Sequence, residues 1–117
     1  MKLSGEGTLV RIFIGESDKH SHQALYDAIV REAKAHGIAG ATVVRGVEGY
    51  GATSRVIHSA KIMRLSEDLP ILIEIVDTKE TIDTFLPQIE KLIEESHSGA
   101  LITLESVHIL RYSSGKQ

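Results

Sequence analysis

The sequence predicts an α+β domain, and three observations support this fold class. A chain of 117 residues with 42% hydrophobic and 25% charged residues matches one ordinary globular domain, so we expect a single domain over residues 1–117. Residues 70–76 form an almost continuous β-branched and aliphatic run that opens with Pro70, which is typical of a strand. The apolar residues that follow recur at helical spacing and predict a helix: Ile82, Phe85, Leu86, Ile89, Leu92 and Ile93.

The first half of the chain predicts one strand, one helix and a second strand. Residues 9–14 are mostly apolar and are followed by a glycine, which favours a strand. Ser17 and Asp18 are expected to cap a helix whose apolar residues recur every four positions as far as Gly37, where a left-handed C-terminal residue is expected. The β-branched residues of 41–47 favour the second strand.

The second half repeats this order after a long connection. Residues 51–69 follow no single pattern and are predicted to form a loop. Asp77 and Glu80 have the spacing of a capping box at the start of the second helix, and Pro87 predicts a kink or a break inside it. Residues 101–110 indicate a final strand or a pair of short ones. The resulting order predicts a ferredoxin-like βαββαβ sandwich, with an antiparallel sheet and two helices on one face.

The composition excludes several classes of function. A net charge of −3 and an aromatic share of 4% offer little for binding phosphate backbones or stacking bases, so no nucleic-acid partner is expected. No apolar segment approaches the ~20 residues that span a bilayer, and the start of the chain lacks a signal-peptide pattern, so we expect a cytoplasmic protein that is not itself a membrane protein. The chain has no cysteine and its 6 histidines are scattered, so no metal site is predicted.

The stretch 45–51 carries the strongest sign of a binding site. Gly46, Gly49 and Gly51 permit backbone conformations that are closed to other residues, and they allow a ligand to approach main-chain N–H groups that can hold an anion. The alternative is a turn or β-bulge at the end of a strand. The chain has no phosphate-loop motif, and its serines lack the surroundings of a catalytic nucleophile, so an enzyme is not predicted.

Residues 37–51 resemble the second-strand region of the PII signalling proteins, which carry a similar Gly-x-x-Gly-x-Thr-Val motif and then Gly-Phe-Gly. Residues 69–76 resemble their next strand. The whole chain is similar to a bacterial family of PII-like proteins catalogued as a domain of unknown function, and His58 and residues 65–70 add to that match. The resemblance implies a cytoplasmic homotrimer that binds small molecules in clefts between subunits and signals through the loop 51–69. Its implied partners are a transporter, a channel or a metabolic enzyme.

The resemblance also assigns individual residues. It places Thr42 at the adenine of a bound nucleotide, Gly51 beside the nucleotide, and Arg111 near a phosphate. With the glycine stretch and the polar residues of the loop added, the predicted ligand-binding residues are Thr42, Arg45, Gly46, Glu48, Gly49, Tyr50, Gly51, Arg55, His58, Arg64 and Arg111.

Three positions depart from the PII pattern. Thr53 stands where those proteins have glutamine, and Ile71 and Ala100 stand where they have lysines. Losing two cations weakens the binding of a triphosphate, because charge-assisted hydrogen bonds are the stronger ones. We therefore expect a less charged ligand, such as a nucleoside monophosphate or another anionic metabolite, and we predict no fixed cofactor. A ligand-free trimeric adaptor is the alternative function.

Overall fold

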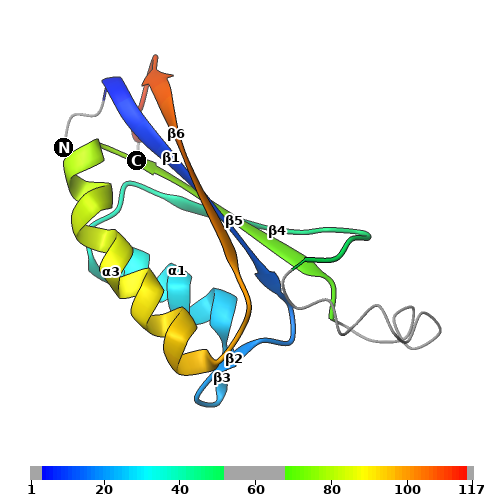
Figure 1. Cartoon of the computed structure of the whole chain (residues 1–117). Helices are drawn as coiled ribbons and strands as arrows, with labels where there is room; N and C mark the ends of the chain where they lie inside the picture. The colour runs from blue at the N-terminus through cyan, green and yellow to red at the C-terminus, as the bar shows by residue number, and fades with distance from the viewer. Residues whose placement is uncertain (1–3, 52–67, 116–117) are drawn as a thin grey trace.

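The computed structural model describes residues 4–51 and 68–115 as a four-stranded antiparallel sheet with two helices on one face (Figure 1). The strands are β1 (Gly5–Gly15), β4 (Ala41–Arg45), β5 (Pro70–Asp77) and β6 (Leu101–Ile109), and the helices are α1 (Leu25–Ala35) and α3 (Lys79–Ser96). The strand order across the sheet is β4-β5-β1-β6. This arrangement confirms the predicted ferredoxin-like fold.

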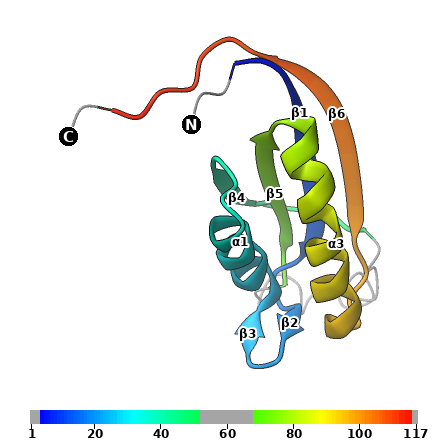
Figure 2. The same cartoon turned by 90° about the vertical axis from the view of Figure 1, so that its left-hand side faces the viewer.

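The two helices pack side by side against the sheet and enclose an aliphatic core (Figure 2). Every second residue of β5 points into this core, so Ile71, Ile73 and Ile75 are buried whereas the residues between them are partly exposed. Burying an aliphatic or aromatic side chain of this size stabilises a fold by roughly 1.5–3 kcal/mol. The other buried apolar side chains come from β1 and both helices: Val10, Ile12, Ile14, Leu25, Ala28, Ile29, Ala33, Ile82, Phe85 and Ile89.

The opposite face of the sheet is not covered by either helix, and its side chains form rows across the strands. Phe13 pairs with Leu72 on one side and with Leu101 on the other. Leu72 in turn pairs with Val44, so these four apolar residues cross the sheet in one row, which we call the apolar row. The neighbouring row, which we call the polar row, holds in sheet order Thr42, Glu74, Arg11 and Thr103.

Arg11 lies in the polar row between two carboxylates. Its Nε donates to Glu74 Oε2 at 2.9 Å, and its Nη1 donates to Glu105 Oε1 at 3.0 Å. The hydrogen bond to Glu74 and the two nearby negative charges raise the pKa of Arg11 above its ordinary value. The helix-free face therefore combines an apolar row with a cluster of one cation and two carboxylates.

The start of α1 differs from the prediction. Ser17 and Asp18 do not cap the helix, because a short hairpin of β2 (Lys19–His20) and β3 (Gln23–Ala24) separates them from it. The helix begins at Leu25 without a side-chain cap. Asp18 still anchors this segment, since its backbone carbonyl accepts a hydrogen bond from the Leu25 N–H at 2.8 Å.

The start and course of α3 also differ from the prediction. Thr78, and not Asp77, is the N-cap residue, and its Oγ1 accepts a hydrogen bond from the Thr81 N–H at 3.2 Å. Asp77 is fully buried at the end of β5, where Oδ1 accepts from the Thr78 N–H at 2.7 Å and Oδ2 accepts from the Ala39 N–H at 2.9 Å. The helix continues through Pro87, so it is not broken into two pieces, because core side chains on both sides of this residue hold it against the sheet.

Three further details concern the ends of elements. Gly37 has a φ of +85°, the left-handed conformation predicted at the end of α1. β4 ends at Arg45, before the predicted end at residue 47. The Gly46 N–H makes the last hydrogen bond to β5, at the Pro70 carbonyl, and the chain then leaves the sheet in the glycine turn. β6 is one continuous strand paired with β1, which decides between the two alternatives. Within the described residues, neither helix is long and apolar enough to cross a membrane.

Candidate functional site

The predicted binding residues that the structure describes lie mainly at two opposite ends of the sheet. One group lies where β1 and β4 end and where β5 and β6 begin. The other group lies where β4 begins and where β6 ends. We call the first the glycine-turn pocket and the second the Thr42–Arg111 pocket.

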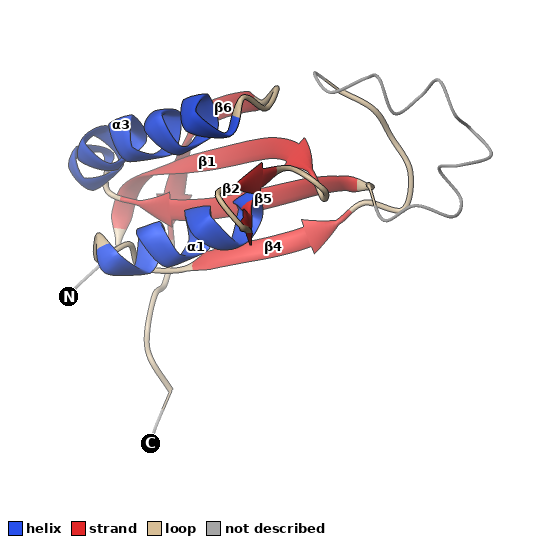
Figure 3. Cartoon of the chain, turned by 90° about the horizontal axis from the view of Figure 1, so that it is seen from below, coloured by secondary structure: helices blue, strands red, loops and turns tan. Residues whose placement is uncertain are grey.

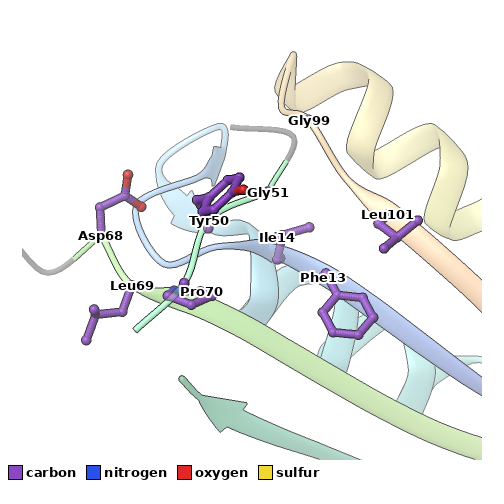
Figure 4. Close-up of a pocket in the computed structure, with 11 residues that line it drawn as sticks. Phe13, Ile14, Tyr50, Gly51, Asp68, Leu69, Pro70, Gly99 and Leu101 are labelled. Atoms are coloured by element: carbon purple, nitrogen blue, oxygen red, sulfur yellow. The ribbon is translucent and has the colours of Figure 1, made fainter. Parts of the chain in front are cut away.

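The glycine-turn pocket has a volume of about 170 Å³ and is lined by residues 13–15, 49–51 and 68–70, together with Gly99 and Leu101. Tyr50 and Asp68 lie on one side of it, and Phe13 and Leu101 lie on the other (Figure 4). The last two residues belong to the apolar row. The pocket is therefore continuous with the helix-free face of the sheet.

Two of the three predicted binding glycines have a packing role. The Gly46 N–H donates to the Pro70 carbonyl at 2.7 Å, and a Cβ at Gly46 would lie 2.9 Å from the Pro70 Cγ. Gly49 has a φ of +150°, and a Cβ there would lie 3.3 Å from the same atom. These glycines let the turn close on Pro70, and the Gly46 N–H is already used. Gly51, in contrast, has open space where a Cβ would be.

Arg45 is held by a carboxylate of the same chain. Its Nη2 donates to Glu16 Oε2, and the second carboxylate oxygen, Glu16 Oε1, is buried with no hydrogen-bond partner among the described residues. The Glu16 N–H donates to the Leu69 carbonyl at 2.8 Å, which ties this ion pair to the wall of the glycine-turn pocket. An external anion would therefore have to compete with Glu16 for Arg45.

Carboxylates outnumber cations around this pocket, counted over the described residues. Asp68 lines it and accepts a hydrogen bond from the Ser17 N–H at 3.0 Å. Asp18 is buried next to it and accepts from the Gly15 N–H at 2.8 Å. The described part of this pocket lacks the charge of a phosphate site.

The Thr42–Arg111 pocket is larger, with a volume of about 480 Å³. Thr42 and Glu74 come from the polar row, and Arg111 and Tyr112 come from the segment that follows β6. Figure 3 shows this segment as a loop that leads toward the C-terminus. The Tyr112 hydroxyl donates to the Ala39 carbonyl at 2.9 Å. This contact brings the segment after β6 next to the start of β4, although the two strands are opposite edges of the sheet.

The polar groups of the Thr42–Arg111 pocket differ in charge. The Arg111 guanidinium has five N–H donors, of which Nε–H reaches Ser113 Oγ at 3.1 Å. Thr42 supplies a hydroxyl, and Glu74 supplies a carboxylate that is paired with Arg11. A cation, a hydroxyl and a carboxylate in one cavity can bind a small molecule that has both an anionic group and hydrogen-bond donors.

The two pockets extend toward opposite ends of β5, although the lining residues Phe13 and Glu74 belong to neighbouring rows of the helix-free face. β5 contributes Pro70 to the glycine-turn pocket and Val76 to the Thr42–Arg111 pocket. The steps between these two positions, at about 3.3 Å each, place them roughly 20 Å apart. The predicted site thus divides into two parts, one at each end of the sheet.

The family model DUF190, described as "Uncharacterized ACR, COG1993", matches residues 7–109. The chain belongs to this family. A UPF0166 protein of Aquifex aeolicus (strain VF5) is 38% identical over 102 residues, which cover 87% of this chain and 91% of that protein. A UPF0166 protein of Methanocaldococcus jannaschii is 37% identical over 103 residues, which cover 88% of this chain and 91% of that protein.

Solved structures of PII-like proteins share the fold of this DUF190 chain. CPII from Thiomonas intermedia K12, in a structure bound to ADP, AMP and acetate, has a TM-score of 0.64 and 15% identity and covers 95% of this chain and 94% of its own. A protein from Thermus thermophilus, described as a putative PII-like signalling protein, has a TM-score of 0.62 and 23% identity and covers 94% of each chain. At these identities the likeness establishes a PII-like fold of the ferredoxin type.

Among the remaining predicted residues, Glu48 lies within the described ranges, and Arg55, His58 and Arg64 do not. Glu48 is exposed on the glycine turn and is not among the described lining residues. Arg55, His58 and Arg64 lie outside the described residues, as does most of the loop 51–69. Across the ranges 4–51 and 68–115, no group of three His, Asp or Glu residues is arranged to hold a metal ion.

Sequence reasoning missed residues of both pockets. Glu74 and Tyr112 line the Thr42–Arg111 pocket, and Phe13 and Asp68 line the glycine-turn pocket. Glu74 carried a visible signal, because it is the one charged residue in the apolar run 71–76. Phe13 and Tyr112 carried none, because their positions depend on strand register and on the path of the chain after β6.

Proposed function

We propose that this DUF190 protein is a PII-like trimeric regulator. In this proposal a small anionic metabolite or an adenine nucleotide binds in the clefts between subunits, and the loop 51–69 signals its presence to a partner such as a transporter, a channel or a metabolic enzyme. The observation that carries the proposal is the cavity lined by both Thr42 and Arg111, which come from the two edges of the sheet.

The Thr42–Arg111 pocket has the size and the polar groups for a small ligand. Its volume of about 480 Å³ falls within the range of roughly 300–1,000 Å³ that is typical of small-molecule sites. A guanidinium such as that of Arg111 can hold a phosphate or carboxylate through two parallel hydrogen bonds. Structures of the PII-like protein CPII contain ADP and AMP with acetate or bicarbonate, which are nucleotides and small anions of the class that this pocket suits.

The far ends of the two pockets and the exposed helix-free face support a site between subunits. Pro70 and Val76 are roughly 20 Å apart in one chain, so a small ligand that reaches both of these positions has to contact two copies of the chain. The helix-free face supports such association, because Phe13, Val44 and Leu101 are 37%, 49% and 54% exposed there. A continuous apolar patch of this kind is a common mark of a protein–protein contact.

Two departures from the PII pattern support a less charged ligand. PII proteins carry a lysine at the position of Ile71. In this chain Ile71 is 2% exposed and belongs to the core. Ala100, at the other such position, packs against the same core. Neither position offers a cation to a ligand, so AMP is expected to bind more tightly than ATP.

Calorimetric titration with AMP, ADP, ATP and bicarbonate tests the proposal on protein whose trimeric state has been established by light scattering. Arg111→Ala is expected to weaken binding of the anionic ligand at least about tenfold while the trimer is retained, because a charged hydrogen-bond donor is removed. Arg31→Ala is the matched control, since it removes an exposed arginine on α1 that does not line the pocket. A trimer that binds none of these compounds contradicts the proposal.

A ligand-free trimeric adaptor is the second candidate, and the packing of the glycine turn favours it. Gly46 and Gly49 close on Pro70, and Arg45 is paired with Glu16, so a purely structural role accounts for these residues. Arg45→Ala separates the candidates. In an adaptor this substitution changes the assembly or nothing, whereas in a sensor it changes the ligand response of an intact trimer.

A further inference from the structure

We infer that Arg11, Glu74 and Glu105 form hydrogen bonds across the contact between two copies of this chain. We call these three side chains the Arg11 cluster. The inference rests on the self-association that is part of the proposed function, but it requires no ligand. It follows from the position of the cluster, from the hydrogen-bonding groups that one chain leaves open and from the charge balance of the helix-free face.

The Arg11 cluster lies among apolar side chains of the helix-free face, and both helices lie on the other side of the sheet (Figure 2). Phe13 of the apolar row is two residues from Arg11 along β1. On the other side of Arg11, Leu9 lies between Val76 and Glu105 in the next row. Rows on one face of a strand are roughly 7 Å apart, so a second chain that covers the apolar row also covers the cluster.

The Arg11 cluster is open to water in a single chain. The side chains of Arg11, Glu74 and Glu105 are 39%, 37% and 57% exposed. Ion pairs with this exposure contribute little to the stability of a fold. The strands that carry them are already joined by their backbone pairing and by the buried side chains of the closed face. A role in binding therefore accounts for the cluster better than a role in folding does.

The Arg11 cluster keeps hydrogen-bonding groups that one chain does not use. The Arg11 guanidinium has five N–H donors, and its hydrogen bonds to the two carboxylates use one on Nε and one on Nη1. Among the described contacts, three N–H donors remain, and so do the acceptors Glu74 Oε1 and Glu105 Oε2. Polar groups that become buried are nearly always hydrogen-bonded, so a chain that covers the cluster has to supply both acceptors and donors.

A second copy of the chain supplies both kinds of group and also matches the charge of this face. Arg111 lines a pocket together with Glu74 and Val76, which belong to the helix-free face. With Arg111 added to the cluster, the described part of the face has two guanidinium groups and two carboxylates. Two copies of such a surface can meet without leaving an unpaired charge, whereas a strongly acidic or strongly basic partner cannot.

Subunit exchange between labelled and unlabelled protein tests the inference. Native mass spectrometry follows the formation of mixed assemblies, and it measures dissociation even when the assembly is tight. Arg11→Met is expected to speed exchange at least about tenfold, because it leaves two carboxylates without their cation in the covered contact. Arg11→Lys keeps the charge but lacks the planar array of five donors, so it should speed exchange by a smaller factor.

Two further variants separate the proposed contact from a general effect of charge. Lys79→Met is the matched control, because it breaks an exposed ion pair with Asp83 on α3, outside the helix-free face. It should leave the exchange rate within about twofold of the wild type. A triple variant with Arg11→Met, Glu74→Leu and Glu105→Leu should exchange more slowly than Arg11→Met alone, because no carboxylate is left buried without its cation.

Three results would overturn the inference. They are a wild-type chain that stays monomeric, exchange of Arg11→Met at the wild-type rate, and faster exchange in the triple variant than in Arg11→Met. A trimer that binds a nucleotide but exchanges at the same rate with and without Arg11→Met rejects the inference and keeps the proposed function. The expected order of exchange rates in an assembly that binds no nucleotide or small anion rejects the proposed function and keeps the inference.

Discussion

The two faces of the sheet differ in how far a single chain completes them. The face under α1 and α3 is closed, and Ile12, Ile73 and Phe85 are each 0% exposed. On the helix-free face Phe13 is 37% exposed and Leu101 is 54% exposed, although they stand on the same strands or on direct neighbours. Residues one position apart along a strand therefore point to different faces and have different roles. Those on the closed face determine the fold, and those on the helix-free face are available for assembly and binding.

The helix-free face also has an internal division. Phe13 and Leu101 of the apolar row line the glycine-turn pocket. Thr42 and Glu74 of the polar row line the Thr42–Arg111 pocket. Each pocket takes its chemical character from the row that reaches it. This relation accounts for an apolar site at one end of the sheet and a charged site at the other.

The largest difference between the two faces is expected for two phenylalanines. Phe85→Ala empties part of the closed core and should lower the free energy of unfolding by about 3–5 kcal/mol, because a cavity is left as well as apolar contact being lost. Phe13→Ala should cost only about 1–2 kcal/mol in the dissociated chain, because Phe13 is 37% exposed there and its removal leaves no enclosed cavity. Denaturant titration at low protein concentration measures both values.

The same pair of variants tests what the helix-free face does. Phe13→Ala is expected to weaken self-association in light-scattering measurements, whereas the Phe85→Ala chain that remains folded should keep its assembly surface. Equal losses of unfolding free energy in the two dissociated chains would show that the two faces are equally closed. That result would remove the basis for assigning different roles to them.

Two carboxylates of β5 extend the comparison between the two faces, with a smaller expected difference in the free energy of unfolding. Asp77 is on the closed face and accepts from the N–H groups of Ala39 and Thr78, whereas Glu74 is on the helix-free face and has a side chain that is 37% exposed. Asp77→Ala leaves two donors without their partner and should lower the unfolding free energy by about 3 kcal/mol. Glu74→Ala should lower it by less than about 1 kcal/mol, because exposed ion pairs contribute little.

A further consequence of Asp77→Ala concerns the Thr42–Arg111 pocket. Ala39 lines this pocket and is held by Asp77, so the variant should also weaken a ligand that binds there. Thermal unfolding and the AMP titration, done on the same samples, measure both effects. A larger loss of unfolding free energy for Glu74→Ala than for Asp77→Ala would contradict the account of both residues.

Much of the fold could be predicted because it depends on local periodicity. The alternation along β5 and the helical spacing in α3 each identify an element and its buried side without knowledge of the rest of the chain. The hairpin of residues 19–24 could not be found in this way, because its strands have two residues each and show no period. Its absence from the prediction led directly to the wrong cap for α1.

The site could be predicted only in part, because its geometry is set by contacts between distant segments. The glycines of 45–51 showed that the backbone there is unusual, but the reason for Gly46 is its approach to Pro70. The pairing of Arg45 with Glu16 joins segments that no local pattern connects. Sequence reasoning could therefore identify candidate cations, but it could not tell which of them is already paired.

The smallest expected effect concerns an ion pair outside both faces of the sheet. His20 Nε2 lies 2.7 Å from Glu95 Oε1, and this hydrogen bond lowers the pKa of Glu95 below its ordinary value. Because the pKa of Glu95 is lowered in the folded state, its hydrogen bond stabilises the protein at pH values above the ordinary glutamate pKa of about 4.3. This contribution to stability is lost as the pH falls through the lowered pKa of the folded state. His20→Ala should therefore return the pKa of Glu95 toward its ordinary value and flatten this part of the acid unfolding curve. His22→Ala, which removes an exposed histidine of the same hairpin turn, should do neither.

NMR titration of the Glu95 carboxyl group measures the shift directly. An unchanged pKa in His20→Ala would show that the hydrogen bond does not hold this part of the hairpin to α3 in solution. Both this pair and the Arg11 cluster are partly exposed, so the response of Glu95 also indicates how little such a pair contributes to stability.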